Sequence, residues 1–119
     1  MIKFLKTEEF NKDLRKLKKK FNSLDDDLET LKKVIEGYLP DPPPGTVRIS
    51  GLGSSVKIPI YKVRKFRCRS LKGNGAKSGL RVIYAYDNPS EQIVFIEIYF
   101  KGNQENEDRE RIIKDFSEK

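Results

Sequence analysis

The chain has 119 residues, the size of one domain spanning 1–119, and carries 25 Lys and Arg against 18 Asp and Glu, for a net charge of +7. It has no histidine, which excludes Ser-His-Asp and Cys-His catalysis within the chain and makes a zinc or haem site unfavourable. One cysteine excludes an intrachain disulfide and fits a reducing compartment. No apolar run is long enough for a secretory signal or a membrane span, so we expect a cytoplasmic protein.

Two amphipathic helices are predicted in the first 40 residues. Thr7 is a suitable N-cap for the first helix and Ser23 for the second, and acidic residues follow each cap, where the helix dipole favours them. The proline-rich segment 40–45 ends the second helix. Each helix has one apolar stripe at helical spacing. The stripes are Phe10, Leu14, Leu17 and Phe21 in the first helix, and Leu28, Leu31, Ile35 and Leu39 in the second.

Strand-forming residues dominate the rest of the chain. Short strands are predicted over 2–5 and 47–49, and longer ones over 60–69, 80–86 and 93–100. A last amphipathic helix is predicted over 105–116. Helices followed by strands joined through turns indicate an α+β fold with an antiparallel sheet. We expect the two N-terminal helices to pack on the sheet face that carries Phe66, Val94, Ile96 and Ile98.

The positive charge is concentrated in one segment. Residues 42–86 contain ten Lys and Arg and no acidic residue, while the rest of the chain has 15 basic and 18 acidic residues. Such a segment attracts polyanions, and nucleic acid is the favoured partner. A solubilising surface or a binding surface for an acidic protein would have the same composition.

Alternation in the predicted strand 60–69 places three cations on one face. Lys65, Arg67 and Arg69 would lie about 6.6–6.8 Å apart, opposite Phe66 and Cys68, because a strand rises about 3.3–3.4 Å per residue. This spacing resembles that of successive phosphates, although an edge strand also uses cations to prevent aggregation. The glycine-rich segment 72–79 fits neither common phosphate-loop pattern and reads as a hairpin loop, whose two lysines could touch a backbone phosphate.

Two further cations border the apolar strands. Arg81 opens the strand over 80–86, and an Arg on a rigid strand can bind a phosphate through two donors. Lys101 follows the last strand and has the same parity as Tyr99 and Glu97. Either residue could instead be an ordinary surface cation at a strand end. Strand parity predicts that Lys65, Arg67, Arg81 and Lys101 meet in one concavity, away from the helices.

Segments 61–67, 78–86 and 93–106, together with the opening 2–17, resemble the RelE/ParE superfamily of toxins from type II toxin–antitoxin systems, in its HigB-like and RelE-like branch. The resemblance implies two N-terminal helices against a curved antiparallel sheet of about four strands, with a C-terminal helix. It also implies ribosome-dependent cleavage of mRNA and a tightly bound antitoxin, without a metal or another cofactor. Two features depart from the pattern: the chain lacks the terminal catalytic Tyr of some members, and segments 40–45 and 51–55 are long.

The resemblance also supplies candidate site residues. Arg67 and Arg81 would bind and stabilise the scissile phosphate, while Lys65 and Lys101 would transfer protons. Five further cations are predicted RNA contacts: Lys62, Arg64, Arg69, Lys72 and Lys77. Two other functions stay open: the ParE branch inhibits DNA gyrase, and a basic domain can bind RNA or protein without catalysis.

Overall fold

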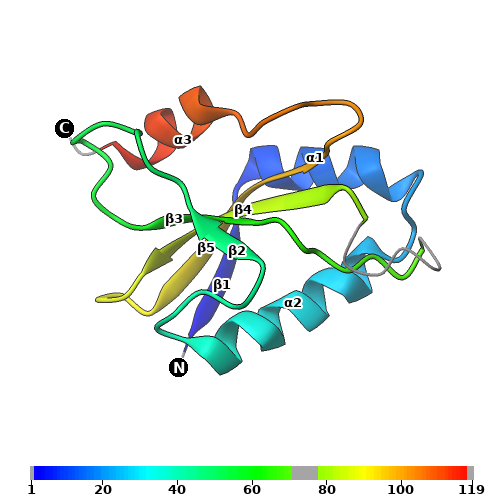
Figure 1. Cartoon of the computed structure of the whole chain (residues 1–119), viewed down its shortest axis with the longest axis horizontal. Coiled ribbons are helices and arrows are strands. Elements are labelled where there is room, and N and C mark those ends of the chain that lie inside the picture. The colour runs from blue at the N-terminus through cyan, green and yellow to red at the C-terminus, as the bar shows by residue number, and fades with distance from the viewer. Residues whose placement is uncertain (1, 71–77, 118–119) are drawn as a thin grey trace.

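A computed structural model describes residues 2–70 and 78–117 (Figure 1). Within these residues the chain is α+β, as the sequence predicts, with three helices and one mixed sheet of five strands. The elements in chain order are β1 (Lys3–Lys6), α1 (Glu8–Lys18), α2 (Leu24–Tyr38), β2 (Thr46–Arg48), β3 (Ile60–Val63), β4 (Leu80–Asp87), β5 (Gln92–Phe100) and α3 (Arg109–Phe116).

Polar side chains define where the helices begin. The Thr7 hydroxyl accepts a hydrogen bond from the Phe10 N–H at 3.0 Å, which caps α1 as predicted. Ser23 stands before α2 but makes no such cap; its hydroxyl donates to the Asp27 carboxylate at 2.6 Å. Asp108 caps α3 by accepting from the Arg111 N–H at 3.1 Å. The last helix therefore begins at Arg109, four residues later than predicted.

The sheet order is β1-β5-β4-β3-β2, with β4 in the centre. Neighbouring strands are antiparallel except β1, which runs parallel to β5 and aligns Phe4 with Ile93. The expectation of a wholly antiparallel sheet of about four strands is therefore wrong. Because β4 already pairs with one edge of β5, the opposite edge is left for the N-terminal strand β1. Helices α1 and α2 and strands β2 to β4 separate β1 from β5 in the sequence.

The two faces of the sheet are covered differently (Figure 1). Helices α1 and α2 cover one face, which we call the hairpin face. Their apolar stripes pack against Tyr84, Phe95 and Ile98, which belong to the sheet. Helix α3 covers part of the other face, which we call the α3 face. There Ile112 of α3 belongs to a second apolar cluster, whose other members come from β3, β4, β5 and the chain after β2. They are Ile49, Leu52, Ile60, Ile83, Ala85, Ile96 and Tyr99.

A β-bulge in β5 changes which side chains face the helices. Ile83 pairs with Glu97 and the next residue, Tyr84, pairs with Phe95, so Ile96 is the extra residue. One extra residue reverses the alternation of the strand. Ile98 lies in the hairpin-face core as predicted, but Val94 and Ile96 pack on the α3 face. The expectation that all three share one face is therefore wrong.

The predicted strand over 60–69 ends early, because β3 stops at Val63. The Arg64 N–H still donates to the Gly45 carbonyl at 2.8 Å, and the chain then leaves the sheet. Its alternation of exposure is nevertheless as predicted. Phe66 and Cys68 are buried in the hairpin-face core, whereas Lys65, Arg67 and Arg69 are exposed.

Candidate functional site

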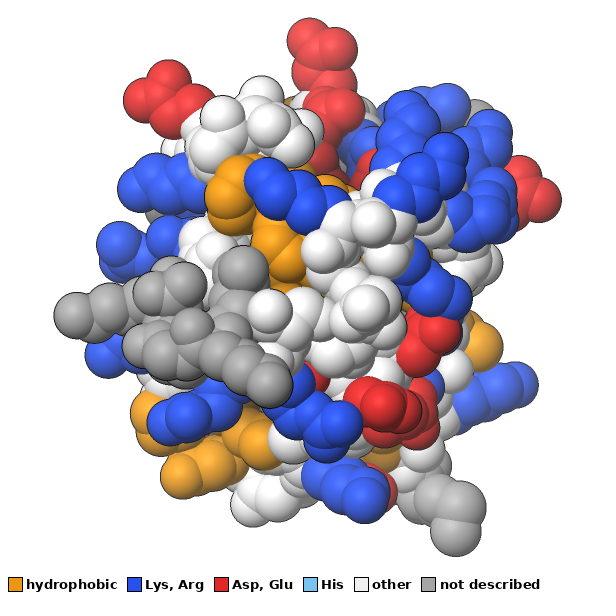
Figure 2. Space-filling view, turned by 90° about the vertical axis from the view of Figure 1, so that its right-hand side faces the viewer, with side chains coloured by type: hydrophobic (Ala, Val, Ile, Leu, Met, Phe, Trp, Pro, Cys, Tyr) orange, Lys and Arg blue, Asp and Glu red, His pale blue; other side chains and the backbone are white. Residues whose placement is uncertain are grey.

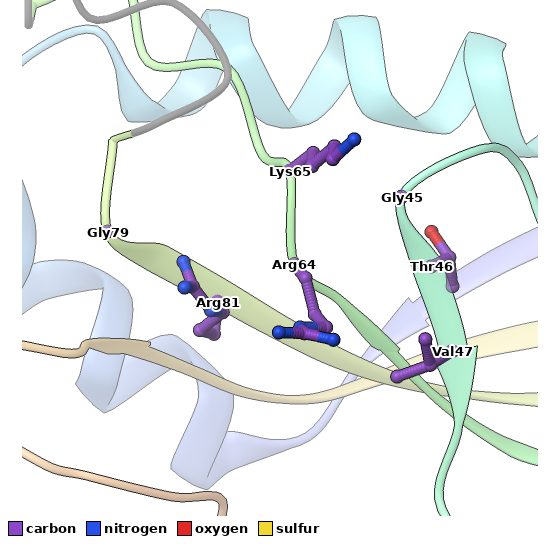
Figure 3. Close-up of a pocket in the computed structure, with 7 residues that line it drawn as sticks. All are labelled: Gly45, Thr46, Val47, Arg64, Lys65, Gly79 and Arg81. Atoms are coloured by element: carbon purple, nitrogen blue, oxygen red, sulfur yellow. The ribbon is translucent and has the colours of Figure 1, made fainter.

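Two adjoining hollows lie on the α3 face, beside the part that α3 covers, and we call them together the basic depression. They share Val47, Arg64 and Arg81 in their walls. The first hollow, of about 450 Å³, is completed by Gly45, Thr46, Lys65 and Gly79 (Figure 3). The second, of about 280 Å³, is completed by Lys62, Tyr99, Lys101, Glu105 and Asn106.

Neighbouring strands bring the central cations of the basic depression together. Arg81, near the start of β4, pairs with Tyr99 of β5, and Arg64 follows β3 on the other side of β4. Figure 3 shows the Arg64 side chain extending toward Arg81, while Lys65 extends away from both. Within the described part of the chain, the Arg81 guanidinium has one hydrogen-bond acceptor, the neighbouring Leu80 carbonyl at 3.3 Å. Among the described residues, Arg64, Arg81 and Lys101 form no ion pair, which leaves three cations available to an anion.

One side of the molecule carries both signs of charge. Figure 2 shows Lys and Arg side chains among Asp and Glu side chains on one side of the molecule. A uniformly basic protein would attract polyanions everywhere, whereas mixed charges leave the attraction to local clusters of unpaired cations. The basic depression is such a cluster.

Lys62 differs from the other cations of the basic depression because it is already paired. Its ammonium lies 2.8 Å from the Glu107 carboxylate, which is only 4% exposed, and Arg109 approaches the same carboxylate at 3.2 Å. Burial alone would raise the pKa of Glu107, but the hydrogen bond and charge of Lys62, with the charge of Arg109, hold the pKa below its ordinary value. Lys62 therefore joins the sheet to the start of α3, and its charge is largely compensated.

Tyr99 contributes a neutral hydroxyl to the wall. Burial raises the pKa of Tyr99 to about 12, with a further increase from Glu107 and Glu97 and an opposing effect of Arg81. The phenol is thus protonated at neutral pH and can donate a hydrogen bond. Burial also raises the pKa of Glu97, although its carboxylate accepts from the Asp108 N–H and the Gln104 amide, both at 2.8 Å. These bonds position the segment that carries Glu105 and Asn106.

Helix α3 is held in place by a cation that bridges three segments. The Arg111 guanidinium lies 2.7 Å from one oxygen of Asp13 in α1 and 3.4 Å from the other. It also donates to the Ile96 carbonyl at 3.1 Å and lies 3.4 Å from the Glu9 carboxylate. A forked, part-buried contact of this kind fixes both position and orientation. The wall of the basic depression that leads into α3 is therefore anchored to α1.

A third hollow, of about 410 Å³, lies on the other side of Lys65, and we call it the α2 groove. Its walls come from α2, the segment between α2 and β2, and the chain after β3. The residues that line it include Leu31, Val34, Tyr38, Pro43, Lys65, Phe66, Arg67 and Arg69. Lys65 is thus common to the α2 groove and the basic depression.

The structure separates the four predicted catalytic residues. Lys65, Arg81 and Lys101 line the basic depression, whereas Arg67 lines the α2 groove. Strand parity failed for Arg67 because the chain leaves the sheet after Val63. Arg64, which the sequence analysis predicted as an RNA contact, lines the basic depression instead of Arg67. Tyr99, Glu105 and Asn106 were not among the predicted site residues, although the parity of Tyr99 with Lys101 was a usable signal.

The other predicted RNA contacts are dispersed. Lys62 lines the basic depression in its pair with Glu107. Arg69 lines the α2 groove and lies 3.7 Å from the exposed Asp26 carboxylate. Lys72 and Lys77 fall outside the described residues.

Comparisons with known proteins identify no relative. No family model matches the chain, and neither the curated proteins nor the solved structures contain a significant match. In the part of the chain that the structure describes, no helix is long and apolar enough to cross a membrane. The same residues contain no group of three or more Cys, Asp and Glu placed to hold a metal ion.

Proposed function

We propose that this chain is the toxin of a type II toxin–antitoxin system, with a RelE-like fold, and that it cleaves mRNA on the ribosome in the cytoplasm. The observation that carries the proposal is the convergence of Arg64, Arg81 and Lys101, all without an ion-pair partner among the described residues, around one hollow. The sequence resemblance supplies the substrate and the partners: mRNA, the ribosome and an antitoxin.

The groups in the basic depression suit cleavage of RNA by its own 2′-hydroxyl. The 2′-oxygen attacks the adjacent phosphorus, a 2′-O–P bond forms, and the P–O5′ bond breaks through a phosphorane with extra negative charge. Arg64 and Arg81 would bind the non-bridging oxygens and stabilise that charge. This step needs no metal or other cofactor, provided that protein groups transfer two protons.

Proton transfer would fall to weak groups, because the chain has no histidine. Lys65 and Lys101 line the basic depression and are the proposed acids, and the Glu105 carboxylate lines it too and can accept the 2′-OH proton. With such groups, most of the acceleration must come from orienting the RNA for attack. A ribosome that presents the message in a fixed conformation would provide that orientation, which explains the proposed dependence on the ribosome.

A reconstituted cleavage assay tests the proposal. Purified protein is added to ribosomes programmed with a 5′-labelled mRNA and, separately, to the same mRNA alone. We expect cleavage within the ribosome-bound message at a much higher rate than in the naked RNA. Arg81→Ala should lower the rate about 10–100-fold, through the loss of a charge-assisted phosphate contact worth about 1.5–3 kcal/mol.

Arg15→Ala is the matched control, because Arg15 is an exposed cation of α1 that lines neither the basic depression nor the α2 groove. It should cleave like the wild type. Programmed ribosomes left intact by the wild-type protein would contradict the proposal, and so would equal activity of the Arg81→Ala variant.

A further inference from the structure

The α2 groove, next to the basic depression, combines an exposed aromatic ring with cations that form no ion pair among the described residues. We propose that it binds an unpaired base of single-stranded RNA, the base of a nucleotide close to the cleaved phosphate, with Tyr38 as the stacking platform. This inference rests on the proposed function, because it takes the RNA that occupies the basic depression as its ligand. It adds a second contact, to a base, at a site that strand parity did not indicate.

The walls of the α2 groove leave apolar surface uncovered. Tyr38 is 50% exposed and Val34 is 40% exposed, one turn apart on α2. Below them Phe66 and Val63 are buried in the hairpin-face core, so the groove has a rigid floor. Exposed aromatic side chains beside a rigid apolar surface are the usual platform on which bases of single-stranded nucleic acid stack.

The charges of the α2 groove favour a polyanion. Lys65 and Arg67 are exposed and form no ion pair among the described residues. Asp27 also lines the groove, but it is 4% exposed and already accepts from the Ser23 hydroxyl at 2.6 Å and from the Arg69 N–H at 3.2 Å. Its carboxylate is therefore already hydrogen-bonded within the protein, and the positive charge of the groove comes from Lys65 and Arg67, which lack an ion pair in the described part of the chain.

Lys65 makes the α2 groove continuous with the basic depression. Its side chain lies against the backbone of Gly45, where an added Cβ would stand 2.7 Å from the Lys65 Cβ. Gly45 also has a φ of +80°, which side-chain-bearing residues rarely adopt, so glycine permits this close approach. Lys65 thus lines both hollows. An RNA strand crossing Lys65 would place a phosphate beside Arg81 and a neighbouring base beside Tyr38.

An acidic, amphipathic peptide is the other occupant that a basic-edged apolar groove could take. RNA is favoured by the shared lysine, because one continuous ligand then satisfies both hollows. A peptide would need no connection with the phosphate-binding cations. The test separates the two ligands.

The experiment measures the affinity of the purified protein for a short, fluorescently labelled single-stranded RNA that is 2′-O-methylated throughout, so that it lacks the attacking hydroxyl and stays intact. Tyr38→Ala should weaken binding about 5–150-fold, the range that loss of one base–aromatic stack produces. Tyr38→Phe keeps the ring and should bind like the wild type. Ile113→Ala removes a comparably exposed apolar residue of α3 outside the groove and should change nothing.

An abasic nucleotide placed in turn at each position of the RNA gives a second readout. At one position, next to the phosphate that contacts Arg81, base removal should weaken binding to the wild type and have little effect on Tyr38→Ala. Arg81→Ala should weaken binding to every one of these RNAs. Such a pattern assigns the lost stacking to one base and one side chain.

The outcomes distinguish the two proposals. If the RNA binds and depends on Arg81 but Tyr38→Ala binds as tightly as the wild type, the α2 groove is no base site and the proposed function stands. If the wild type binds no RNA, the base-binding inference is overturned, whereas the proposed function is decided separately by the cleavage assay on programmed ribosomes. If Tyr38→Ala instead weakens only the binding of a synthetic peptide of alternating Glu and Leu, the groove is a protein-docking surface and this inference is overturned.

Discussion

The two faces of the sheet differ in how completely helices cover them. The hairpin face is covered by two helices, and its core is continuous and apolar from Phe10 to Ile98. The α3 face is covered by one helix of eight residues, so part of it stays open and carries Arg64, Arg81 and Lys101. A sheet with both faces equally covered would have no room for this cluster.

The contrast also explains where charge is tolerated. On the α3 face, Lys62 is paired with Glu107 and Arg111 with Asp13, so the cations near the core are compensated. Those at the open end are not paired within the described residues. A buried charge requires a partner because it has lost its hydration, whereas a charge at the solvent-exposed edge stays hydrated and needs no partner within the protein. The following variants test this division, from the largest expected effect on folding to the smallest.

Removing a large side chain from the hairpin face should have the largest effect. Phe10 is fully buried and stacks on Phe95 with ring centroids 5.5 Å apart. Phe10→Ala should lower the free energy of unfolding by about 3–5 kcal/mol, because it removes apolar contacts and leaves a cavity. Urea denaturation of Phe10→Ala beside Ile113→Ala, which should change stability by less than about 0.5 kcal/mol, measures the difference. Equal midpoints for these two variants would show that the hairpin face is not the main source of stability.

Removing the buried charge at the start of α3 should have an intermediate effect. Glu107→Gln keeps the shape but leaves Lys62 without its counter-charge, and we expect a loss of about 1.5–3 kcal/mol in the free energy of unfolding. Burial alone would raise the pKa of Glu107, but the hydrogen bond and charge of Lys62 hold it below its ordinary value in the folded protein. The ion pair therefore stabilises the fold fully at pH values above the pKa of the unfolded chain, and this contribution is lost as the pH falls through the folded-state pKa.

The stability difference between wild type and Glu107→Gln should thus be constant near neutral pH and shrink below about pH 4.5. Urea titrations at a series of pH values provide the measurement. A difference that grew as the solution became more acidic would contradict this assignment of the ion pair.

Arg81→Ala should have the smallest effect on folding, because Arg81 is half-buried at a strand end and has no ion-pair partner among the described residues. We expect a change of less than about 0.5 kcal/mol in the free energy of unfolding. Its effect on binding should be clear, since one phosphate contact is lost. The slope of log affinity for single-stranded RNA against log salt should fall by about 0.7. A variant that loses both stability and binding would mean that Arg81 belongs to the core.

The sequence predicted the helices and strands more accurately than it predicted which face of the sheet each side chain occupies. Helical spacing and caps located α1 and α2, and the apolar run over 80–86 correctly indicated a central strand. The bulge at Ile96 could not be foreseen, because one extra residue leaves the composition of a strand unchanged while it reverses the side chains beyond it. The parallel pairing of β1 with β5 joins residues far apart in the sequence, such as Lys3 and Gln92, and local patterns do not encode such a pairing.

The candidate site was predicted in part for the same reason. Parity holds inside regular strands, so Arg81 and Lys101 were placed on the open side of the sheet together. It fails after Val63, where the chain leaves the sheet, and Arg64 rather than Arg67 reaches the basic depression. The alternation of buried and exposed residues persisted there because Phe66 and Cys68 enter the core even without strand pairing. Hydrophobic burial thus preserved the alternation of buried and exposed residues beyond the end of β3. Without a regular strand, however, the cations there do not line up on one face of the sheet.

Mapping of mRNA 5′ ends after induced expression tests the central claim most directly. Wild type, Arg81→Ala and Arg15→Ala are expressed to equal levels, and the 5′ ends of cellular transcripts are sequenced shortly after induction. We predict new ends inside translated reading frames for the wild type and Arg15→Ala, and about 10–100-fold fewer for Arg81→Ala. Transcripts that stay intact in cells making the wild-type protein, or identical new ends with Arg81→Ala, would contradict the account.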